Sequence, residues 1–362
     1  MPKGIYKRKE IGYNQFNKNA KRKTKHHERG NDMNVKAKNK PGGASKLREL
    51  LAHQEMVVVL VIILLAIYLT IVRPDSFPTT MNIFNVLRQA SHYAVLAVGM
   101  GFVIITGGVD LSVGAVIACS ICVATYANLN SENGINPFLV LLIILAVGLA
   151  FGLLNGVLVA KIGLPPFIAT MGVLKIGNGI ALLVSNGSPI KYGESWISVF
   201  GGAYIGSVPV SVIFMIVVVV LAWMFAKYTV LGRNIYAVGC NERAAKLSGI
   251  NTENVTIFTY AVSGLMSAFV GLLMLGQLKQ AGPSYGDGYE LDAIAACVIG
   301  GISMTGGEGN IFGVILGATL MSLLKNLFVQ VAVPGYWQTV VLGIVIIFSV
   351  AIDCFRKKRE AR

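Results

Sequence analysis

Long apolar runs dominate this chain and constrain it more than any other feature. Three of the clearest, at 56–71, 138–160 and 208–225, approach the roughly 20 residues that an α-helix needs to cross a bilayer. Over the whole chain 54% of the residues are hydrophobic and only 13% are charged, too few to cover a soluble domain of this length. The runs therefore predict an all-α fold and a polytopic membrane protein.

We expect about ten transmembrane helices in a domain that covers residues 56–355. The predicted helices lie at about 57–72, 87–106, 111–128, 138–160, 164–184, 208–226, 254–277, 291–303, 311–331 and 337–354. Small residues let helix backbones approach closely in lipid, where no hydrophobic force drives helices together. The glycines at 148, 152 and 156 fall on one face at helical spacing, so they predict a packing seam.

Basic residues collect at the two ends of the chain. Before Val57 there are 15 Lys and Arg against 5 Asp and Glu, and residues 356–362 carry five more basic residues. Such clusters beside apolar spans mark the cytoplasmic side, so both termini are expected there, which requires an even number of crossings. Residues 1–55 are predicted to be a disordered tail that faces solvent or lipid headgroups, and 356–362 a second basic tail. The net charge of +14 is therefore concentrated at the two ends of the chain and does not form a nucleic-acid-binding face.

A polar segment at 231–250 interrupts the apolar runs and predicts a short helix of its own. Asn241 suits the N-cap, Glu242 suits the positive end of the helix, and Gly249 can supply the left-handed residue that ends it. We expect a helix from Glu242 to Ser248. Its other members are small or modestly apolar, namely Ala244, Ala245 and Leu247. So short a helix cannot be stable alone, which indicates a docking element in the loop 227–253.

Asp110 lies where one apolar run ends and the next begins, between Gly107-Gly108 and Leu111. A carboxylate among membrane spans is costly unless it has a structural partner or a function. Two interpretations stay open: Asp110 caps the helix that starts at Leu111, or this break, with Ser112 and Gly114, lines a polar translocation path.

A second break at 306–310 is the counterpart of the first. Both follow the pattern GG-x5-G, at 107–114 and at 306–313, and the offset of 199 residues also aligns the spans around them. Transporters are often built from such repeats, so Gly307 is a candidate for the same path.

Acidic residues precede the predicted span at 291–303. They are Asp287, Glu290 and Asp292. Acid–base catalysis or a metal site would need a nucleophile, a His or a further ligand set, and none accompanies them. We expect them to cap the helix and to contribute to an outer gate or to the docking of a receptor.

No motif for enzyme chemistry or for a cofactor is found in the sequence. The pattern G-x4-G-K-[ST] is absent, so any ATP must be hydrolysed by another subunit. Cys119 and Cys122 form a C-x-x-C, but no second ligand pair accompanies them, and they are interpreted as packing residues. We expect no catalytic residues, no metal and no cofactor in this chain.

Five motifs in order resemble those of one known family. They are GVDLSVG at 108–114, SNGSPI at 185–190, GRNIYAVGCNERAAKLSGI at 232–250, GYELDAIAA at 288–296 and GGISMTGGEG at 300–309. Together they are similar to the permease subunit of bacterial ribose-type ABC importers, over residues 57–354.

This resemblance implies a permease homodimer in the bacterial inner or plasma membrane, two cytoplasmic ATPase subunits and an extracytoplasmic sugar-binding protein. It also implies that Gly232, Arg233 and the residues that follow, as far as Gly249, form the loop that couples to the ATPase. The chain would supply a passage for a monosaccharide, ribose first among the candidates.

An ion-driven secondary transporter for a small polar solute is the alternative. It would bury titratable residues along its path, and only Asp110, Lys175 and Lys325 qualify. It would also leave the segment 231–250 without a role.

Overall fold

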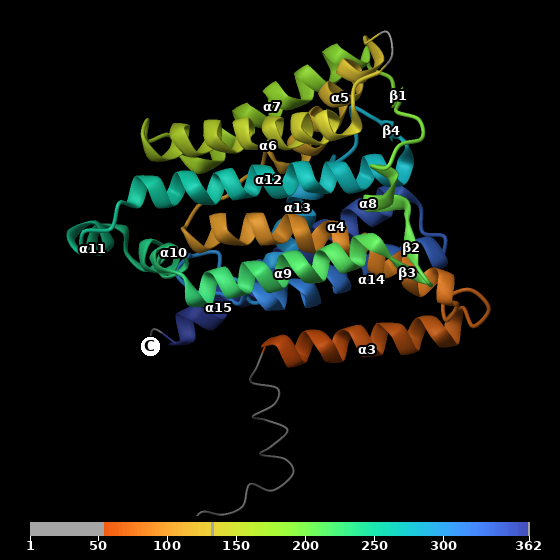
Figure 1. Ribbon diagram of the computed structural model, residues 1–362. Coiled ribbons are helices and arrows are strands. Elements are labelled where there is room, and N and C mark those ends of the chain that lie inside the picture. The colour runs from red at the N-terminus through yellow and green to blue at the C-terminus, as the bar shows by residue number, and fades with distance from the viewer. Residues whose placement is uncertain (1–53, 132–133, 361–362) are drawn as a thin grey trace, which may run out of the picture. The chain divides into compact units, whose positions relative to one another are not determined.

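A computed structural model of the chain describes residues 54–131 and 134–360, and these are almost entirely helical (Figure 1). The helices are α3 (Gln54–Val72), α4 (Thr80–Ile105), α5 (Val113–Leu129), α6 (Pro137–Ala160), α7 (Pro166–Ser185), α8 (Ser198–Gly202), α9 (Val210–Tyr228), α10 (Val230–Cys240), α11 (Glu242–Leu247), α12 (Thr252–Leu278), α13 (Tyr289–Ile299), η1 (Ile311–Gly313), α14 (Val314–Gln330) and α15 (Gly335–Glu360). The strands in this part of the chain form two antiparallel pairs. They are β1 (Ile190–Lys191) with β4 (Gln280–Ala281), and β2 (Tyr204–Ile205) with β3 (Val208–Pro209).

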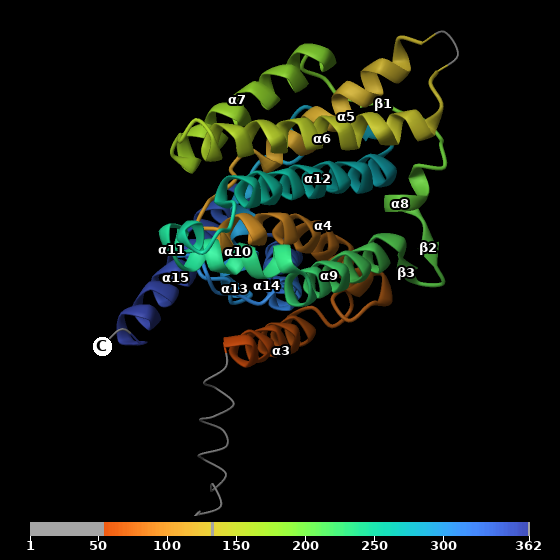
Figure 2. The same cartoon turned by 60° about the vertical axis from the view of Figure 1, so that its left-hand side comes forward.

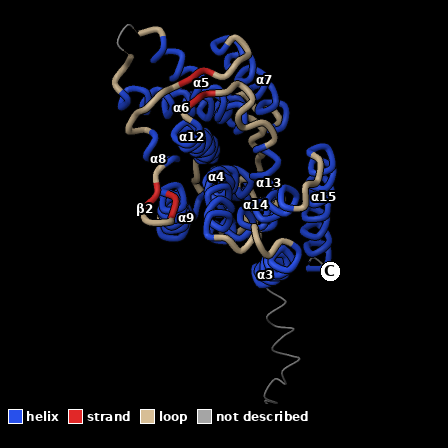
Figure 3. The backbone as a smooth tube through the Cα atoms, turned by 90° about the vertical axis from the view of Figure 1, so that its right-hand side faces the viewer, coloured by secondary structure: helices blue, strands red, loops and turns tan. Residues whose placement is uncertain are grey.

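Two helices, α4 and α12, form the centre of the helical domain. They pack on each other, α6 packs on α12, and α5 packs on α7 (Figures 1 and 2). On the other side α9 and α14 pack on α4, and α3 packs on α14. Seen end-on, the helices surround the α4–α12 pair (Figure 3). We refer below to the end that holds α10 and α11 as the α11 end, and to the end that holds β2 and β3 as the hairpin end.

The burial of each helix follows its place in this arrangement. From Ala90 to Ile105 every residue of α4 is buried, which is typical of a helix that is apolar on all sides and surrounded by others. By contrast α3 exposes large apolar side chains along its length, among them Leu64 and Ile71. Such a surface suits lipid rather than water.

Glycines permit the closest contact, between α6 and α12. A methyl group added at Gly148 would meet the Gly264 carbonyl oxygen 2.5 Å away, and one at Gly156 would lie 2.7 Å from the Cα of Ile257. At Gly152 it would lie 2.9 Å from the Cα of Ala261. The predicted packing seam is therefore confirmed, with α12 as its partner.

The structure confirms a polytopic helical membrane protein, but it does not establish ten crossings. Within the described residues, six helices are long and apolar enough to span a bilayer: α3, α6, α7, α9, α12 and the segment from η1 through α14. Two shorter apolar helices, at Val113–Leu129 and Gly335–Phe348, fall below that length. The tail predicted for 1–55 lies outside the described residues except at Gln54 and Glu55, which begin α3. At the other end of the chain α15 continues to Glu360, beyond the end predicted for the last span at 354.

The segment predicted as a span at 291–303 differs most from expectation. It forms the 11-residue α13, about 16 Å long at 1.5 Å per residue, which is too short to cross a bilayer. The turn before it uses the left-handed backbone of Gly286 and Gly288, with φ of +99° and +81°. These glycines let the segment fold back so that Gly286 packs against Gly114 in the first turn of α5. The residues before α13 therefore reach into the helical domain.

Candidate functional site

The short helix predicted from the polar segment is present as α11. Asn241 has an extended backbone, and its side-chain oxygen accepts a hydrogen bond from the Ala244 N–H at 3.0 Å. The helix runs over Glu242–Leu247, and Gly249 follows it with φ +85°. An N-cap and a left-handed glycine thus end the helix at the predicted places, with Ser248 one residue beyond it.

One face of α11 has no contact with the rest of the described chain. Ala245 is 5% exposed and anchors the helix, whereas Leu247 is 90% exposed. Arg243, Ala244 and Ser248 are exposed as well. An apolar side chain held this far into solvent by a capped helix is typical of a surface that a partner covers.

The helix before it, α10, is set at a fixed angle to α9 by a tight turn. Thr229 caps α10 by accepting from the Gly232 N–H at 2.9 Å. A side chain at Gly232 would come within 2.7 Å of the Cα of Ala226, so only glycine fits this turn. Arg233, beside it, is exposed. The resemblance to a coupling loop gave no reason for Gly232, and the structure supplies one.

At its other end α10 reaches both helix breaks. The Gly307 N–H donates to the Ile105 carbonyl at 2.8 Å, and Gly239 of α10 packs against both of these groups. Tyr236 of α10 donates its hydroxyl to the Gly309 carbonyl at 3.0 Å. Burial raises the pKa of Tyr236, so the phenol stays protonated and remains a donor.

The two GG-x5-G segments also touch each other. A methyl group at Gly306 would lie 3.1 Å from the Gly107 nitrogen and 3.1 Å from the Ile105 oxygen. The repeat predicted from an offset of 199 residues therefore brings its two glycine pairs into contact. Since α10 packs against the same point, one contact joins the segment that carries α11 to both breaks.

A cavity of about 290 Å³ opens beside this contact at the α11 end. Its walls come from the end of α4, the turn between α6 and α7, α11 and the start of α12. Glu242 of α11 and Gly107 of the first break both line it. The docking helix and the break thus border the same space.

Asp110 lies in a packed interior rather than at this cavity. It is 1% exposed, and its carboxylate accepts from the Ser112 N–H at 3.0 Å and from the Ser112 hydroxyl at 2.6 Å. Ser263 of α12 donates at 2.8 Å and Asn155 of α6 at 3.3 Å. Asp110 thus ties the break to α6 and α12 through neutral donors. A residue that lined a polar path would face open space, and Asp110 faces none in this conformation.

We expect Asp110→Asn to destabilise the helical domain, because the amide has one acceptor oxygen instead of two and a neutral oxygen accepts more weakly than a carboxylate. The loss of charge-assisted hydrogen bonds costs about 2–3 kcal/mol. Thermal unfolding in detergent should show a lowered midpoint, and Asp75→Asn, the same change at an exposed carboxylate, should leave it unchanged. Equal midpoints for both variants would contradict the structural role of Asp110.

The three acidic residues before and within α13 are placed differently from one another. Asp287 is exposed, and Glu290 is half-buried, with one carboxylate oxygen close to Gly114. Asp292 is 4% exposed and forms an ion pair with Lys325 of α14 at 2.5 Å. Asp292 is therefore inaccessible to a docking receptor in this conformation, while the role expected of Asp287 and Glu290 stays a prediction.

Lys325 does not extend to a membrane surface, as a lysine near a helix end commonly does, but is held inside the domain. Besides Asp292 it donates to the Tyr93 hydroxyl at 2.9 Å, and its ammonium lies 4.8 Å from the centre of the Tyr93 ring. This pair joins α13 to α14 and, through Tyr93, to α4. The sequence offered no signal for it, because 33 residues separate the two charges.

Removal of one partner of this pair should be costly. We expect Lys325→Met to destabilise the domain by about 3–5 kcal/mol, because Asp292 would remain buried without a counter-charge. The double variant Lys325→Met with Asp292→Leu should recover most of this loss, since it leaves no buried charge. Thermal unfolding of the two single variants and the double variant measures the coupling, and additive effects would count against the pair.

Comparisons with known proteins agree with the motifs. A family model described as "Branched-chain amino acid transport system / permease component" matches residues 82–350. The chain is 40% identical to the ribose import permease protein RbsC of Haemophilus influenzae over 296 residues, 81% of this chain and 90% of that protein. It is 38% identical to the RbsC of Bacillus subtilis over 300 residues, 82% of this chain and 90% of that protein.

A second group of relatives is named for the import of a different sugar. The galactose/methyl galactoside import permease protein MglC of Salmonella typhimurium is 35% identical over 316 residues, 83% of this chain and 94% of that protein. No solved structure matches the chain. The family match and the extent of these identities confirm the resemblance found in the motifs. The chain belongs to this family of bacterial transport permeases and is an importer permease of the ribose type.

Proposed function

We propose that this chain is the passage-forming subunit of an ATP-driven monosaccharide importer, with ribose as its first candidate substrate. The observation that carries the proposal is the path from the exposed Leu247 of α11, through Gly239 of α10, to the two helix breaks. A separate ATPase that moved α11 would thereby move both breaks. The names of the relatives support ribose first and galactose second.

The same proposal includes the partners and the orientation. Two copies of the chain form the passage, each α11 is held by a cytoplasmic ATPase subunit, and a sugar-binding protein delivers the sugar from outside. ATP is bound only by the ATPase, and this chain carries no cofactor. Both termini and the α11 end face the cytoplasm of a bacterial inner or plasma membrane, with ten crossings if α13 is counted as one together with the segment before it, which reaches into the domain.

An ion-driven mechanism is less well supported by the buried charges. Asp110 is held by neutral donors, and Asp292 is paired with Lys325. Both carboxylates are buried, and Lys175 is exposed on α7. Asp110, Asp292 and Lys325 are therefore explained by the contacts that they make between helices.

Reconstitution tests this function. The chain, its ATPase and its sugar-binding protein in proteoliposomes should accumulate ribose only when ATP is supplied on the ATPase side, and uptake should persist when the proton gradient is collapsed. Omission of the ATPase should abolish it. Uptake that follows the proton gradient and ignores the ATPase would refute the proposal and favour the ion-driven alternative.

A further inference from the structure

A second cavity, near the hairpin end, has no role in the account so far. Its volume is about 320 Å³, at the lower end of the range of about 300–1,000 Å³ for small-molecule sites. Its walls come from the first half of α4, the last residues of α12 and the first residue of α13. It lies beside α4 and α12, toward the ends of these helices opposite to the cavity at the α11 end.

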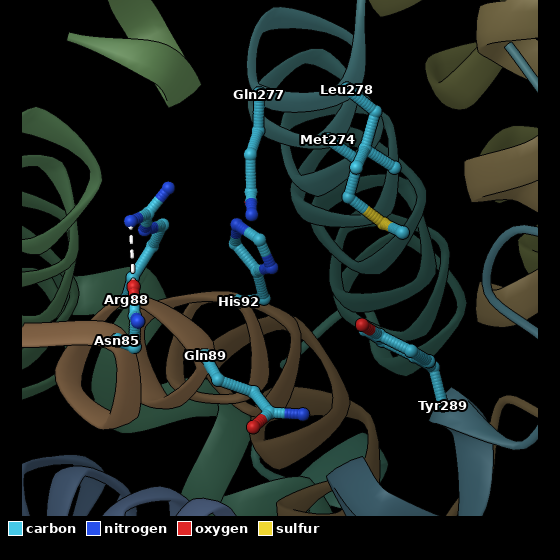
Figure 4. Close-up of a pocket in the computed structure, with 8 residues that line it drawn as sticks. All are labelled: Asn85, Arg88, Gln89, His92, Met274, Gln277, Leu278 and Tyr289. Carbon is cyan, nitrogen blue, oxygen red and sulfur yellow. Dashed lines mark hydrogen bonds between the residues drawn. The ribbon is translucent and has the colours of Figure 1, made fainter. Parts of the chain in front are cut away.

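Polar side chains with spare hydrogen-bonding capacity line this cavity. His92 is 5% exposed, and its Nε2 is buried without a hydrogen-bond partner in the described chain. The Nε of Arg88 is likewise buried and unpaired, while another nitrogen of its guanidinium donates to Asn85 at 2.8 Å. His92 and the amide of Gln277 point toward each other across the gap between α4 and α12 (Figure 4). Buried polar groups of this kind are costly unless water or a ligand satisfies them.

The rest of the lining adds apolar surface and a fixed rim. Tyr289 presents its ring from α13, and Met274 and Leu278 line the cavity from α12. Arg88 also donates to the Tyr204 hydroxyl, so the β2–β3 hairpin holds the guanidinium in place. A sugar ring has the matching chemistry, because its hydroxyls both donate and accept while its C–H faces pack on aromatic and apolar side chains.

Below the cavity α4 and α12 close on each other. A methyl group at Gly99 would lie 2.8 Å from the Cα of Ser263, so no space continues along this helix pair. Gly99 lies two turns beyond His92 on α4. In this conformation the helix pair is therefore closed at Gly99, on the side of the cavity toward the α11 end.

We propose that this cavity is a monosaccharide-binding site within the permease, in which Arg88, His92 and Gln277 hold the sugar hydroxyls after release from the sugar-binding protein. The inference rests on the proposed function and deepens it. No carboxylate lines the site, and the Arg88 guanidinium that does already donates to Asn85 and Tyr204. A neutral, hydroxyl-rich ligand thus fits better than a cation.

Uptake and ATP hydrolysis, measured in the same proteoliposomes, test the site. We expect Gln277→Leu, which keeps side-chain size but removes the amide, to lower ribose uptake about tenfold while receptor-stimulated ATP hydrolysis changes less than twofold. His92→Phe should do the same. The control is Ser211→Ala, which removes a buried, unpaired hydroxyl outside the cavity and should leave both rates unchanged.

A labelling experiment keeps the inference testable if these variants fold poorly. Leu278, 41% exposed, lies at the rim, and a Leu278→Cys variant should react with an impermeant thiol reagent several-fold more slowly in excess ribose. Leu129→Cys, at the 62% exposed end of α5, should be unaffected. If the wild-type assembly imports ribose but the cavity variants import equally well and ribose gives no protection, this inference fails and the proposed function stands. If the wild-type assembly imports no sugar, the proposed function fails.

Discussion

Leu247→Asp should abolish ATP-driven uptake while leaving the permease folded in the membrane. Leu247 is 90% exposed, so the substitution removes no contact within the chain. If the ATPase covers this side chain, the change removes about 2–3 kcal/mol of apolar burial and buries a charge, which weakens the affinity at least 30- to 100-fold. The affinity of the purified ATPase for the permease, measured in detergent, gives this value directly.

The matched control for this variant is Asn254→Asp. It introduces the same carboxylate at the same end of the domain, in the exposed first turn of α12, where a negative charge suits the helix. We expect it to bind the ATPase as the wild type does. An unchanged affinity for Leu247→Asp would show that α11 is not the docking surface.

Gly239→Ala should separate ATPase binding from transport. The added methyl group would meet the Ile105 carbonyl and lie 2.5 Å from the Gly307 nitrogen, so α10 must move away from the two breaks. The exposed face of α11, which we propose binds the ATPase, is unaltered. We therefore expect ATPase affinity within about twofold of wild type and sugar uptake lowered at least tenfold, in proteoliposomes that still hydrolyse ATP.

Gly179→Ala provides the control for this variant. Gly179 also lies within a helix, α7, but a methyl group there meets nothing within 4 Å. It should therefore be neutral or slightly stabilising, since alanine favours a helix by about 0.5–1 kcal/mol over glycine. Wild-type uptake in Gly239→Ala would mean that α10 does not act on the breaks through this contact.

Local signals in the sequence were sufficient for α11 and for most of the long helices. Asn241 and Gly249 act through their own backbone neighbours, so the position of the short helix could be predicted without knowledge of the fold. The sequence alone did not distinguish Ala244 from Ala245. Ala245 is buried and Ala244 is exposed, so a bulky residue at 245 would disturb α11 itself. Of these two positions, only 244 lies on the surface of the helix and can be used to test it.

Contacts between distant segments account for what the sequence could not show. The apolar composition of 291–303 resembles that of any span, but α13 ends at Ile299, just before the left-handed Gly301, while the turn at Gly286 and Gly288 fixes its start at Tyr289. The ties of Asp110 to Asn155 and Ser263 cross 45 and 153 residues of chain. Nor did any local pattern indicate that α10 would meet the breaks.

Cys240 offers the most direct test of the central claim, that α10 and α11 face the cytoplasm and are held there by an ATPase. Cys119, Cys122 and Cys297 are buried, so in a Cys354→Ser variant Cys240 is the one exposed thiol. An impermeant thiol reagent should label it in inside-out vesicles but not in intact cells, and bound ATPase should slow the labelling. Labelling of Cys240 from outside intact cells would reverse the orientation and contradict the account.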